Sequence, residues 1–158
     1  MTRMPTAHLI CGPLGSGKTT FARRLESEIS ALRFTHDEWM VILCGQDPPL
    51  GQFPDYFQRV TTLINSIWPR SLELGLDVIL DLNFWRRSQR DEVRRMVAAR
   101  GGTSTLYWLG SRKEVAWERV KNRNGNSTDL CITPETFESL WPQIEPLGLD
   151  EEHVVISI

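Results

Sequence analysis

The sequence lacks the cysteine and histidine patterns of disulfide-bonded and zinc-binding proteins. It has only three cysteines and three histidines in 158 residues. Cys11, Cys44 and Cys131 are odd in number and far apart, which argues against a disulfide framework, and no two of them have CxxC spacing. The histidines are equally scattered and indicate no metal cluster. This cysteine usage is typical of a reducing compartment, so we expect a cytoplasmic protein.

Long hydrophobic runs and an excess of basic residues are also missing. Uninterrupted apolar runs extend over only a few residues, so the sequence predicts no membrane span. The segment MTRMPTAHLICGP has no long apolar region of the kind found in signal peptides. The formal net charge of −2 argues against coating of nucleic acid by charge alone, although a local basic groove stays open.

Short apolar segments alternate with amphipathic ones along the whole chain, and the length fits one domain over residues 1–158. Such alternation predicts an α/β fold, a doubly wound parallel sheet with helices on both faces. We expect strands at residues 7–12, 32–36, 77–83, 103–110 and 153–158, and helices at residues 17–30, 38–45, 56–74, 88–100, 113–124 and 134–141.

The segment GPLGSGKT, residues 12–19, matches the P-loop pattern G-x-x-x-x-G-K-[ST] at every position and lies between a predicted strand and helix. Its glycines let consecutive N–H groups converge on phosphates. We expect Lys18 to reach the β- and γ-phosphates, Thr19 to bind Mg²⁺, and Thr20 to contact the α-phosphate. A plain glycine turn with a solvated lysine is the alternative. The expected cradle consists of Gly12, Pro13, Leu14, Gly15, Ser16 and Gly17.

Two carboxylates follow predicted strands, where ligands of parallel sheets bind. Asp81 ends the apolar run VILD and is the expected second metal ligand, or else an ordinary cap of the next turn. Asp37 in THDEWM is the expected general base for an acceptor hydroxyl, and it also suits the N-cap of a helix. His36 beside it is a candidate substrate contact.

Two basic stripes have helical spacing. Arg119 and Arg123 lie four residues apart before a Gly/Asn-rich loop, which is typical of a lid that brings arginines onto a nucleotide; we place this lid at about residues 119–132. Arg86 and Arg90 follow the Asp81 strand and are candidate contacts to a polar acceptor, as is Asn83. A solvated basic face paired with Glu118 is the alternative for the first stripe, and a surface helix face balanced by Asp91 and Glu92 explains the second stripe equally simply.

Together these motifs resemble the small P-loop kinases of the group that contains polynucleotide kinase, chloramphenicol phosphotransferase and the zeta toxins. GPLGSGKTT, THDEWM, VILDLNFWRRSQRDEVRRMVAARG and YWLGSRKEVAWERVKNR follow that group's order. The resemblance implies a three-layer α/β/α fold with five parallel strands in the order 2-3-1-4-5. It also implies Asp37 as base, Lys18 and Thr19 as phosphate and metal residues, and Arg119 and Arg123 as lid arginines.

The motifs therefore predict an Mg·ATP-dependent phosphotransferase. Polynucleotide kinase-like sequences often carry arginine before the base, where this chain has His36, which favours a small acceptor (antibiotic, sugar or nucleoside) over a nucleic-acid 5′-hydroxyl. A nucleotide-dependent hydrolase or switch is a second hypothesis, although N-K-x-D and D-x-x-G motifs are missing. A non-catalytic ATP-binding regulatory module is the third. The acceptor and the oligomeric state stay open.

Overall fold

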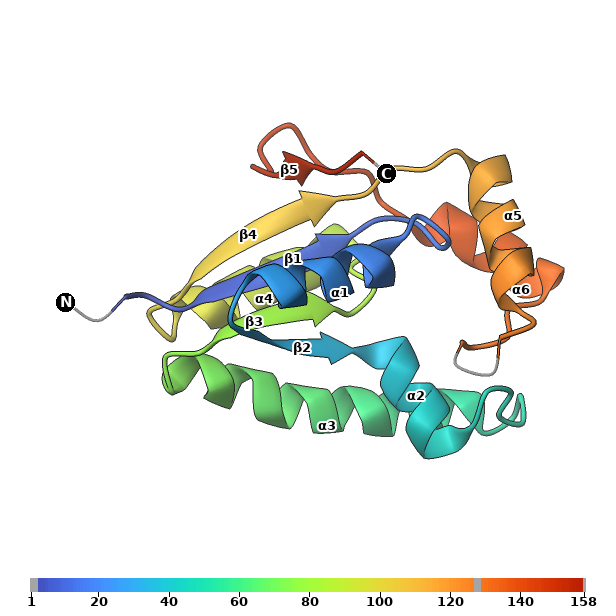
Figure 1. Ribbon diagram of the computed structural model, residues 1–158, viewed down its shortest axis with the longest axis horizontal. Coiled ribbons are helices and arrows are strands. Elements are labelled where there is room, and N and C mark those ends of the chain that lie inside the picture. The colour runs from blue at the N-terminus through green and yellow to red at the C-terminus, as the bar shows by residue number, and fades with distance from the viewer. Residues whose placement is uncertain (1–2, 127–128, 158) are drawn as a thin grey trace.

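The computed structural model describes residues 3–126 and 129–157 of the chain (Figure 1). Strands and helices alternate through most of it, as the sequence pattern predicts. The elements are β1 (Thr6–Cys11), α1 (Lys18–Glu28), β2 (Ala31–Thr35), α2 (His36–Cys44), α3 (Phe53–Glu73), β3 (Asp77–Asp81), α4 (Arg87–Ala98), β4 (Thr103–Trp108), α5 (Lys113–Arg123), α6 (Pro134–Leu140), the 3₁₀ turn η1 (Trp141–Gln143) and β5 (Val154–Val155).

The five strands form one parallel sheet in the order β2-β3-β1-β4-β5, which confirms the expected order. All five residues of β3 are buried, which explains its continuous apolar run. β5 has only two residues, Val154 and Val155, and both are exposed, so the predicted strand over residues 153–158 is shorter than expected. β5 pairs with β4 alone and forms the sheet edge.

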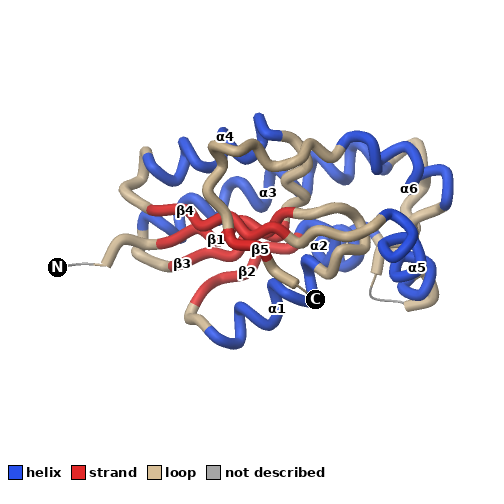
Figure 2. Tube along the Cα trace, turned by 90° about the horizontal axis from the view of Figure 1, so that it is seen from above, coloured by secondary structure: helices blue, strands red, loops and turns tan. Residues whose placement is uncertain are grey.

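Helices cover both faces of the sheet, so the molecule has three layers (Figure 2). Alternate residues of the central strands supply the two interfaces: Val78 and Leu80 pack in one hydrophobic cluster, and Ile79 between them packs in the other. The first cluster lies under α3 and α4, and the second lies under α1, through Phe21 and Leu25. This division follows from the two-residue period of a strand.

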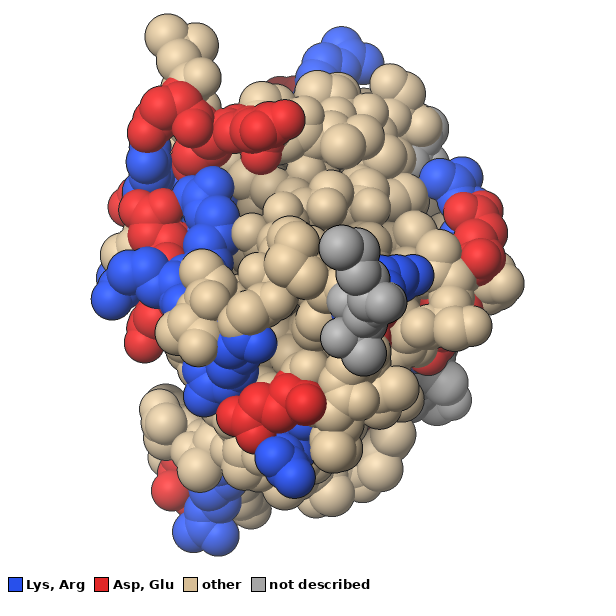
Figure 3. Space-filling model, turned by 90° about the vertical axis from the view of Figure 1, so that its left-hand side faces the viewer, with Lys and Arg blue, Asp and Glu red and all other residues tan. Residues whose placement is uncertain are grey.

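The surface at the amino ends of the strands mixes charges of both signs. Lys and Arg side chains lie beside Asp and Glu along this face, and neither sign forms a continuous patch across it (Figure 3). Such interspersed charge gives no extended positive field in the part of the face that is visible.

Within residues 3–126 and 129–157, no helix combines the length and hydrophobicity that crossing a membrane requires.

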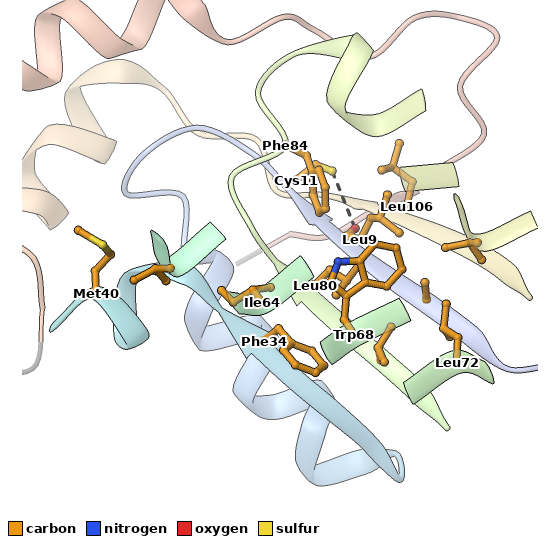
Figure 4. Packing of buried hydrophobic residues seen from close by; sticks show 14 residues of the cluster. Leu9, Cys11, Phe34, Met40, Ile64, Trp68, Leu72, Leu80, Phe84 and Leu106 are labelled. Atoms are coloured by element: carbon orange, nitrogen blue, oxygen red, sulfur yellow. Dashed lines mark hydrogen bonds between the residues drawn. The ribbon is translucent and has the colours of Figure 1, made fainter. Parts of the chain in front are cut away.

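α3 is the longest helix and supplies one stripe of core residues. Val60, Ile64, Trp68 and Leu72 recur every four residues and are at most 2% exposed. Figure 4 shows Ile64, Trp68 and Leu72 among the buried residues of the first cluster. The helix starts at Phe53, three residues before the predicted start, because Pro54 suits the first helical turn. It continues through Pro69 to Glu73.

The carboxyl ends of β1, β2 and β3 meet at one end of the sheet. The chain leaves β1 through the glycine loop into α1, and it leaves β2 directly into α2. Figure 1 places α2, the start of α3, α5 and α6 at this same end. β1 lies between β3 and β4. The connection after β1 leads to β2 on one side of it, and the connection after β3 leads to β4 on the other side. α/β sheets open a crevice for ligands at such a reversal of strand order.

The position of Arg90 differs from the expected one. This side chain is fully buried and forms two hydrogen bonds of 2.8 Å with the carboxylate of Glu151. It also donates to the carbonyls of Phe84 and Pro146. Arg94 donates to the same carboxylate at 2.7 Å. Arg90 therefore ties the segment before β5 to α4 and does not face the crevice.

Loss of this buried charge pair is expected to destabilise the fold. In Glu151→Gln the guanidinium of Arg90 stays buried without its anion, so we expect a loss of about 3–5 kcal/mol in the free energy of unfolding at pH 7. Urea unfolding measures it. Glu152→Gln, the same change at the exposed neighbour, should change it by less than about 0.5 kcal/mol. Equal stability of both variants would contradict this role.

The same pair gives the stability a pH dependence. Hydrogen bonds from Arg90, with burial opposing them, hold the pKa of Glu151 at about 2, below its ordinary 4.5. A depressed carboxyl pKa stabilises the folded state above about pH 4.5, and this contribution is lost as the pH falls toward 2. The difference in unfolding free energy between wild type and Glu151→Gln should therefore shrink by about 3 kcal/mol across this window.

Candidate active site

The loop between β1 and α1 is built on three glycines with positive φ. Gly12, Gly15 and Gly17 have φ angles of 154°, 71° and 92°. Two of them also leave no room for a side chain: a Cβ on Gly12 would lie 2.3 Å from the Leu109 carbonyl oxygen, and one on Gly15 would lie 2.3 Å from that of Ala116. The glycines of the motif are therefore required by conformation and by close contact with the neighbouring backbone.

Substitution of Gly15 by alanine is expected to displace this loop. The added methyl group collides with the first turn of α5, and the left-handed conformation adds strain. Gly45→Ala is the matched control, since Gly45 has φ 86° and nothing within 4 Å of a Cβ. We expect Gly15→Ala to cost about 1–3 kcal/mol more than Gly45→Ala in calorimetry and to abolish nucleotide binding selectively. Equal effects of the two variants would contradict this.

The loop presents polar groups that have no partner in the protein. The N–H groups of Gly15 and Gly17 donate to no other group among the described residues, and α1 has no side-chain cap at its N-terminus. The buried hydroxyl of Ser16 also has no hydrogen-bond partner in this part of the chain. Unpaired donors at the start of an 11-residue helix suit an anion with several oxygens, such as a nucleotide phosphate. The residues present therefore fit the expected ligand.

Lys18 lies over the loop. It is 7% exposed, and its ammonium donates a 2.8 Å hydrogen bond to the Pro13 carbonyl. Burial lowers the pKa of Lys18, while the carboxylates of Asp81 and Asp37 act in the opposite direction.

Two further residues of the predicted phosphate-binding segment lie beside Lys18 in the sequence. Leu14 is buried against α5 and α6, and Thr20 is exposed in the first turn of α1.

Thr19 and Asp81, the predicted metal ligands, lie in contact with each other. The Thr19 hydroxyl donates to the carboxylate of Asp81 at 2.7 Å, and Asp81 is 4% exposed. Burial raises the pKa of Asp81 to about 6, and Lys18 opposes this rise. A hydroxyl and a carboxylate are hard oxygen donors that suit Mg²⁺. The described residues contain no group of three His, Cys, Asp or Glu side chains that could hold a metal ion by themselves, so water and phosphate oxygens would complete its coordination.

Asp37 lies beside this pair, in the first turn of α2. The Asn83 side chain donates to it at 3.4 Å. Asn83 has φ 56°, the left-handed conformation that asparagine tolerates best among residues with a side chain. This backbone turn after β3 brings the amide to Asp37, so the two predicted residues lie together although 46 positions separate them.

Two clefts with shared lining residues surround these groups. The inner cleft is lined by Leu14, Gly15, Gly17, Lys18, Thr19, Asp37, Asp81, Asn83 and Arg123. The outer cleft is lined by Thr19, Asp37, Glu38, Arg123, Asp129, Leu130 and Ile132. They share Thr19, Asp37 and Arg123, so these side chains stand at the junction. Arg119 approaches the same loop, with a guanidinium nitrogen 3.4 Å from the Gly15 carbonyl oxygen.

The predicted lid is attached to the rest of the molecule on both sides of residues 127–128, which lie outside the described residues. The Asn124 side chain forms two hydrogen bonds, of 2.8 and 3.0 Å, with the backbone of Ile132. The Cys131 N–H donates to the Gln46 carbonyl at 3.3 Å, and the Gln46 side chain donates to the Asn126 carbonyl. Gln46 therefore supports the segment that lines the outer cleft.

Three expected substrate contacts lie elsewhere. His36 is 4% exposed between α2 and α3, and its Nε2 lies 3.0 Å from the Thr61 hydroxyl. Burial lowers the pKa of His36, so the ring is neutral at pH 7. Arg86 is exposed, lines neither cleft, and lies 3.4 Å from the side-chain oxygen of Gln143. Arg90 is in the buried pair with Glu151 described above.

The outer cleft also contains residues that sequence analysis did not single out. Asp129, Leu130 and Ile132 line it, and they belong to the predicted lid, but their contacts to distant segments leave no local pattern. One local feature of the sequence points to a folded-back segment here. Asn124 stands before a Gly/Asn loop, and asparagine side chains often form hydrogen bonds with nearby backbone, as Asn124 does with Ile132.

Solved structures with the same fold include proteins named as kinases. A presumed kinase from Chloroflexus aurantiacus j-10-fl has a TM-score of 0.76 at 16% identity, covering 98% of this chain and 88% of its own. A gluconokinase from Sinorhizobium meliloti 1021 has a TM-score of 0.66 at 16% identity, with coverages of 98% and 83%. A chain of the Pnkp1/Rnl/Hen1 RNA repair complex has a TM-score of 0.72 at 22% identity, and this chain covers only 45% of it.

At these identities the likeness shows the fold, which is that of P-loop kinases. A search of the curated proteins finds no match. The model of the AAA_33 family, described as an AAA domain, matches residues 8–145. This range contains the glycine loop, Asp37, Asp81 and both arginines of α5. The chain therefore belongs to the AAA_33 family of AAA domains.

Proposed function

We propose that this chain, as one domain over residues 1–158, transfers the γ-phosphoryl group of Mg·ATP to a hydroxyl of a small molecule. The observation that carries the proposal is the position of Asp37 at the junction of the two clefts, beside Thr19 and Arg123. A phosphate held on the glycine loop and a hydroxyl in the outer cleft would both lie next to this carboxylate. Such an arrangement suits in-line transfer.

Each polar group at the junction has a role that follows from its chemistry. The inner-cleft backbone N–H groups and Lys18 hold the phosphates and neutralise charge that develops on the leaving oxygen. Thr19 and Asp81 would hold Mg²⁺, which would supply charge neutralisation and orientation of the phosphates. Arg119 and Arg123 steady the transferred group from the side of α5.

Asp37 orients the acceptor hydroxyl and takes its proton as the oxygen bonds to the γ-phosphorus and the bond to the ADP oxygen breaks. Its hydrogen bond from Asn83 holds the carboxylate toward the junction. The family and the fold, together with structural neighbours named as a presumed kinase and a gluconokinase, support this proposal.

A coupled assay of ADP formation tests the proposal. Neutral sugars, nucleosides, antibiotics and 5′-hydroxyl oligonucleotides are added in turn, and the products are analysed by mass spectrometry. We expect ADP and a phosphorylated organic product in equal amounts with at least one acceptor class. ADP with inorganic phosphate alone would favour a hydrolase, and nucleotide binding without ADP would favour a regulatory module.

A polynucleotide 5′-hydroxyl kinase is the second candidate. It is favoured by the likeness to a chain of the Pnkp1/Rnl/Hen1 RNA repair complex over 91% of the present chain. The oligonucleotide arm of the assay separates it from a small-molecule kinase.

A further inference from the structure

We propose that the acceptor is a small amino alcohol or neutral polyol, and that Asp129 selects it by rejecting anions. This inference rests on the proposed phosphotransferase function.

The charges of the outer cleft are mostly negative. Three of its seven lining residues, Asp37, Glu38 and Asp129, carry carboxylates, and Arg123 is its one cation among the described residues. Glu38 is neutralised, because Arg23 donates to one of its oxygens at 2.9 Å and Arg33 to the other at 2.8 Å.

Asp37 and Asp129 have no direct ion pair of this kind, although Lys18 acts on Asp37 from a greater distance. Neither forms an ion pair with a cation within 4 Å in the described part of the chain; the side-chain partner of Asp37 is Asn83, and that of Asp129 is Asn126, each at 3.4 Å. Two carboxylates without an ion-pair partner within 4 Å therefore line the cleft where an acceptor would bind. Only one of them, Asp37, is needed to take the proton of the acceptor.

Arg123 does not change this balance for the acceptor. It also lines the inner cleft, together with Lys18 and the glycine loop, where phosphate would bind. With nucleotide present its charge is directed to the phosphates. An anionic acceptor would then meet the γ-phosphate and two carboxylates, whereas an ammonium or hydroxyl group would find an acceptor of hydrogen bonds in Asp129.

Two apolar residues of the outer cleft are held by packing against the rest of the molecule. Leu130 packs against the cluster under α3 and α4, and Ile132 packs against the cluster of Leu14 and Phe137. The bonds from Asn124 and Gln46 hold this covering segment at both ends. A nucleic-acid end would need Lys or Arg for its phosphates. The arginines beside Glu38 are engaged in pairs with it.

A charge-fractionated metabolite extract tests the inference while the identity of the acceptor is still open. A deproteinised extract is separated into fractions retained by a cation exchanger, retained by an anion exchanger, and retained by neither. Each is incubated with the wild-type protein and γ-labelled ATP, alongside a 5′-hydroxyl oligonucleotide. We expect labelled organic product from the cationic or neutral fraction.

Label in the anionic fraction or on the oligonucleotide would overturn the inference while the kinase function stands. If no organic product is labelled in any arm, both the function and the inference are wrong.

Asp129→Asn then tests the residue with the acceptor that the active fraction contains. We expect the KM for that acceptor to rise by about tenfold or more, with kcat within about twofold and the KM for ATP unchanged. Asp55→Asn, which removes an exposed carboxylate of α3 paired with Arg59, is the matched control and should change none of these values. An unchanged acceptor KM in Asp129→Asn would overturn the assignment.

Discussion

Replacement of Asp37 by asparagine is expected to lower the rate of phosphoryl transfer by about 10²–10⁴-fold. Asparagine keeps the shape of the side chain and a polar contact to Asn83, but it cannot take the proton of an acceptor hydroxyl. Nucleotide affinity should stay within about threefold of wild type, because the glycine loop, Thr19 and Asp81 are unchanged. Initial rates of product formation and calorimetric titration with ADP measure the two quantities.

The control for Asp37→Asn is the same substitution at Asp55, which we expect to be without effect on either quantity. A variant that retains full transfer would show that Asp37 is only a structural residue of the first turn of α2. A variant that loses nucleotide affinity as strongly as activity would place Asp37 among the phosphate and metal residues instead.

Lys18→Met is expected to lower transfer by about 10²–10³-fold and to weaken nucleotide binding. Its buried ammonium is the cation that lies over the loop and acts on Asp81. Methionine fills a similar volume, and burial already disfavours the charge of Lys18. We therefore expect the melting temperature to change by no more than about 4 °C, so that function is lost while the fold is kept.

Lys121→Met is the matched control, since Lys121 is exposed on α5 and pairs with Glu118. It should keep both the activity and the melting temperature. A Lys18→Met protein that binds nucleotide with wild-type affinity would contradict the role of this side chain. A variant that unfolds would be compared with Lys18→Arg, which retains the charge and should regain the fold without full activity.

The donor half of the candidate site is predictable from sequence because it is local. The glycine loop depends on backbone conformations and on a helix start within eight consecutive residues, and the structure has both features there. Asp37 and Asp81 are predictable for a different reason, since the ends of parallel strands meet at one edge of a sheet. Their approach to Thr19 follows from the strand order β2-β3-β1.

The acceptor half depends on contacts between distant segments, which sequence periodicity does not report. Arg90 has the helical spacing typical of an exposed basic face. Its side chain is nevertheless buried, in an ion pair with Glu151, which lies 61 positions away in the sequence. His36 lines neither cleft, because its side chain lies between α2 and α3 and its Nε2 is hydrogen-bonded with the Thr61 hydroxyl of α3. Asp129 faces the cleft because the segment after α5 folds back on Gln46.

The most direct measurement is the fate of the γ-phosphate. The protein is incubated with Mg·ATP labelled on that phosphate and with a deproteinised metabolite extract, and the label is followed by mass spectrometry. We expect one labelled phosphate in an organic hydroxyl compound for each ADP formed, with the product greatly reduced in Asp37→Asn. Recovery of the label solely as inorganic phosphate, or an equal yield from Asp37→Asn, would contradict a phosphotransferase built around Asp37.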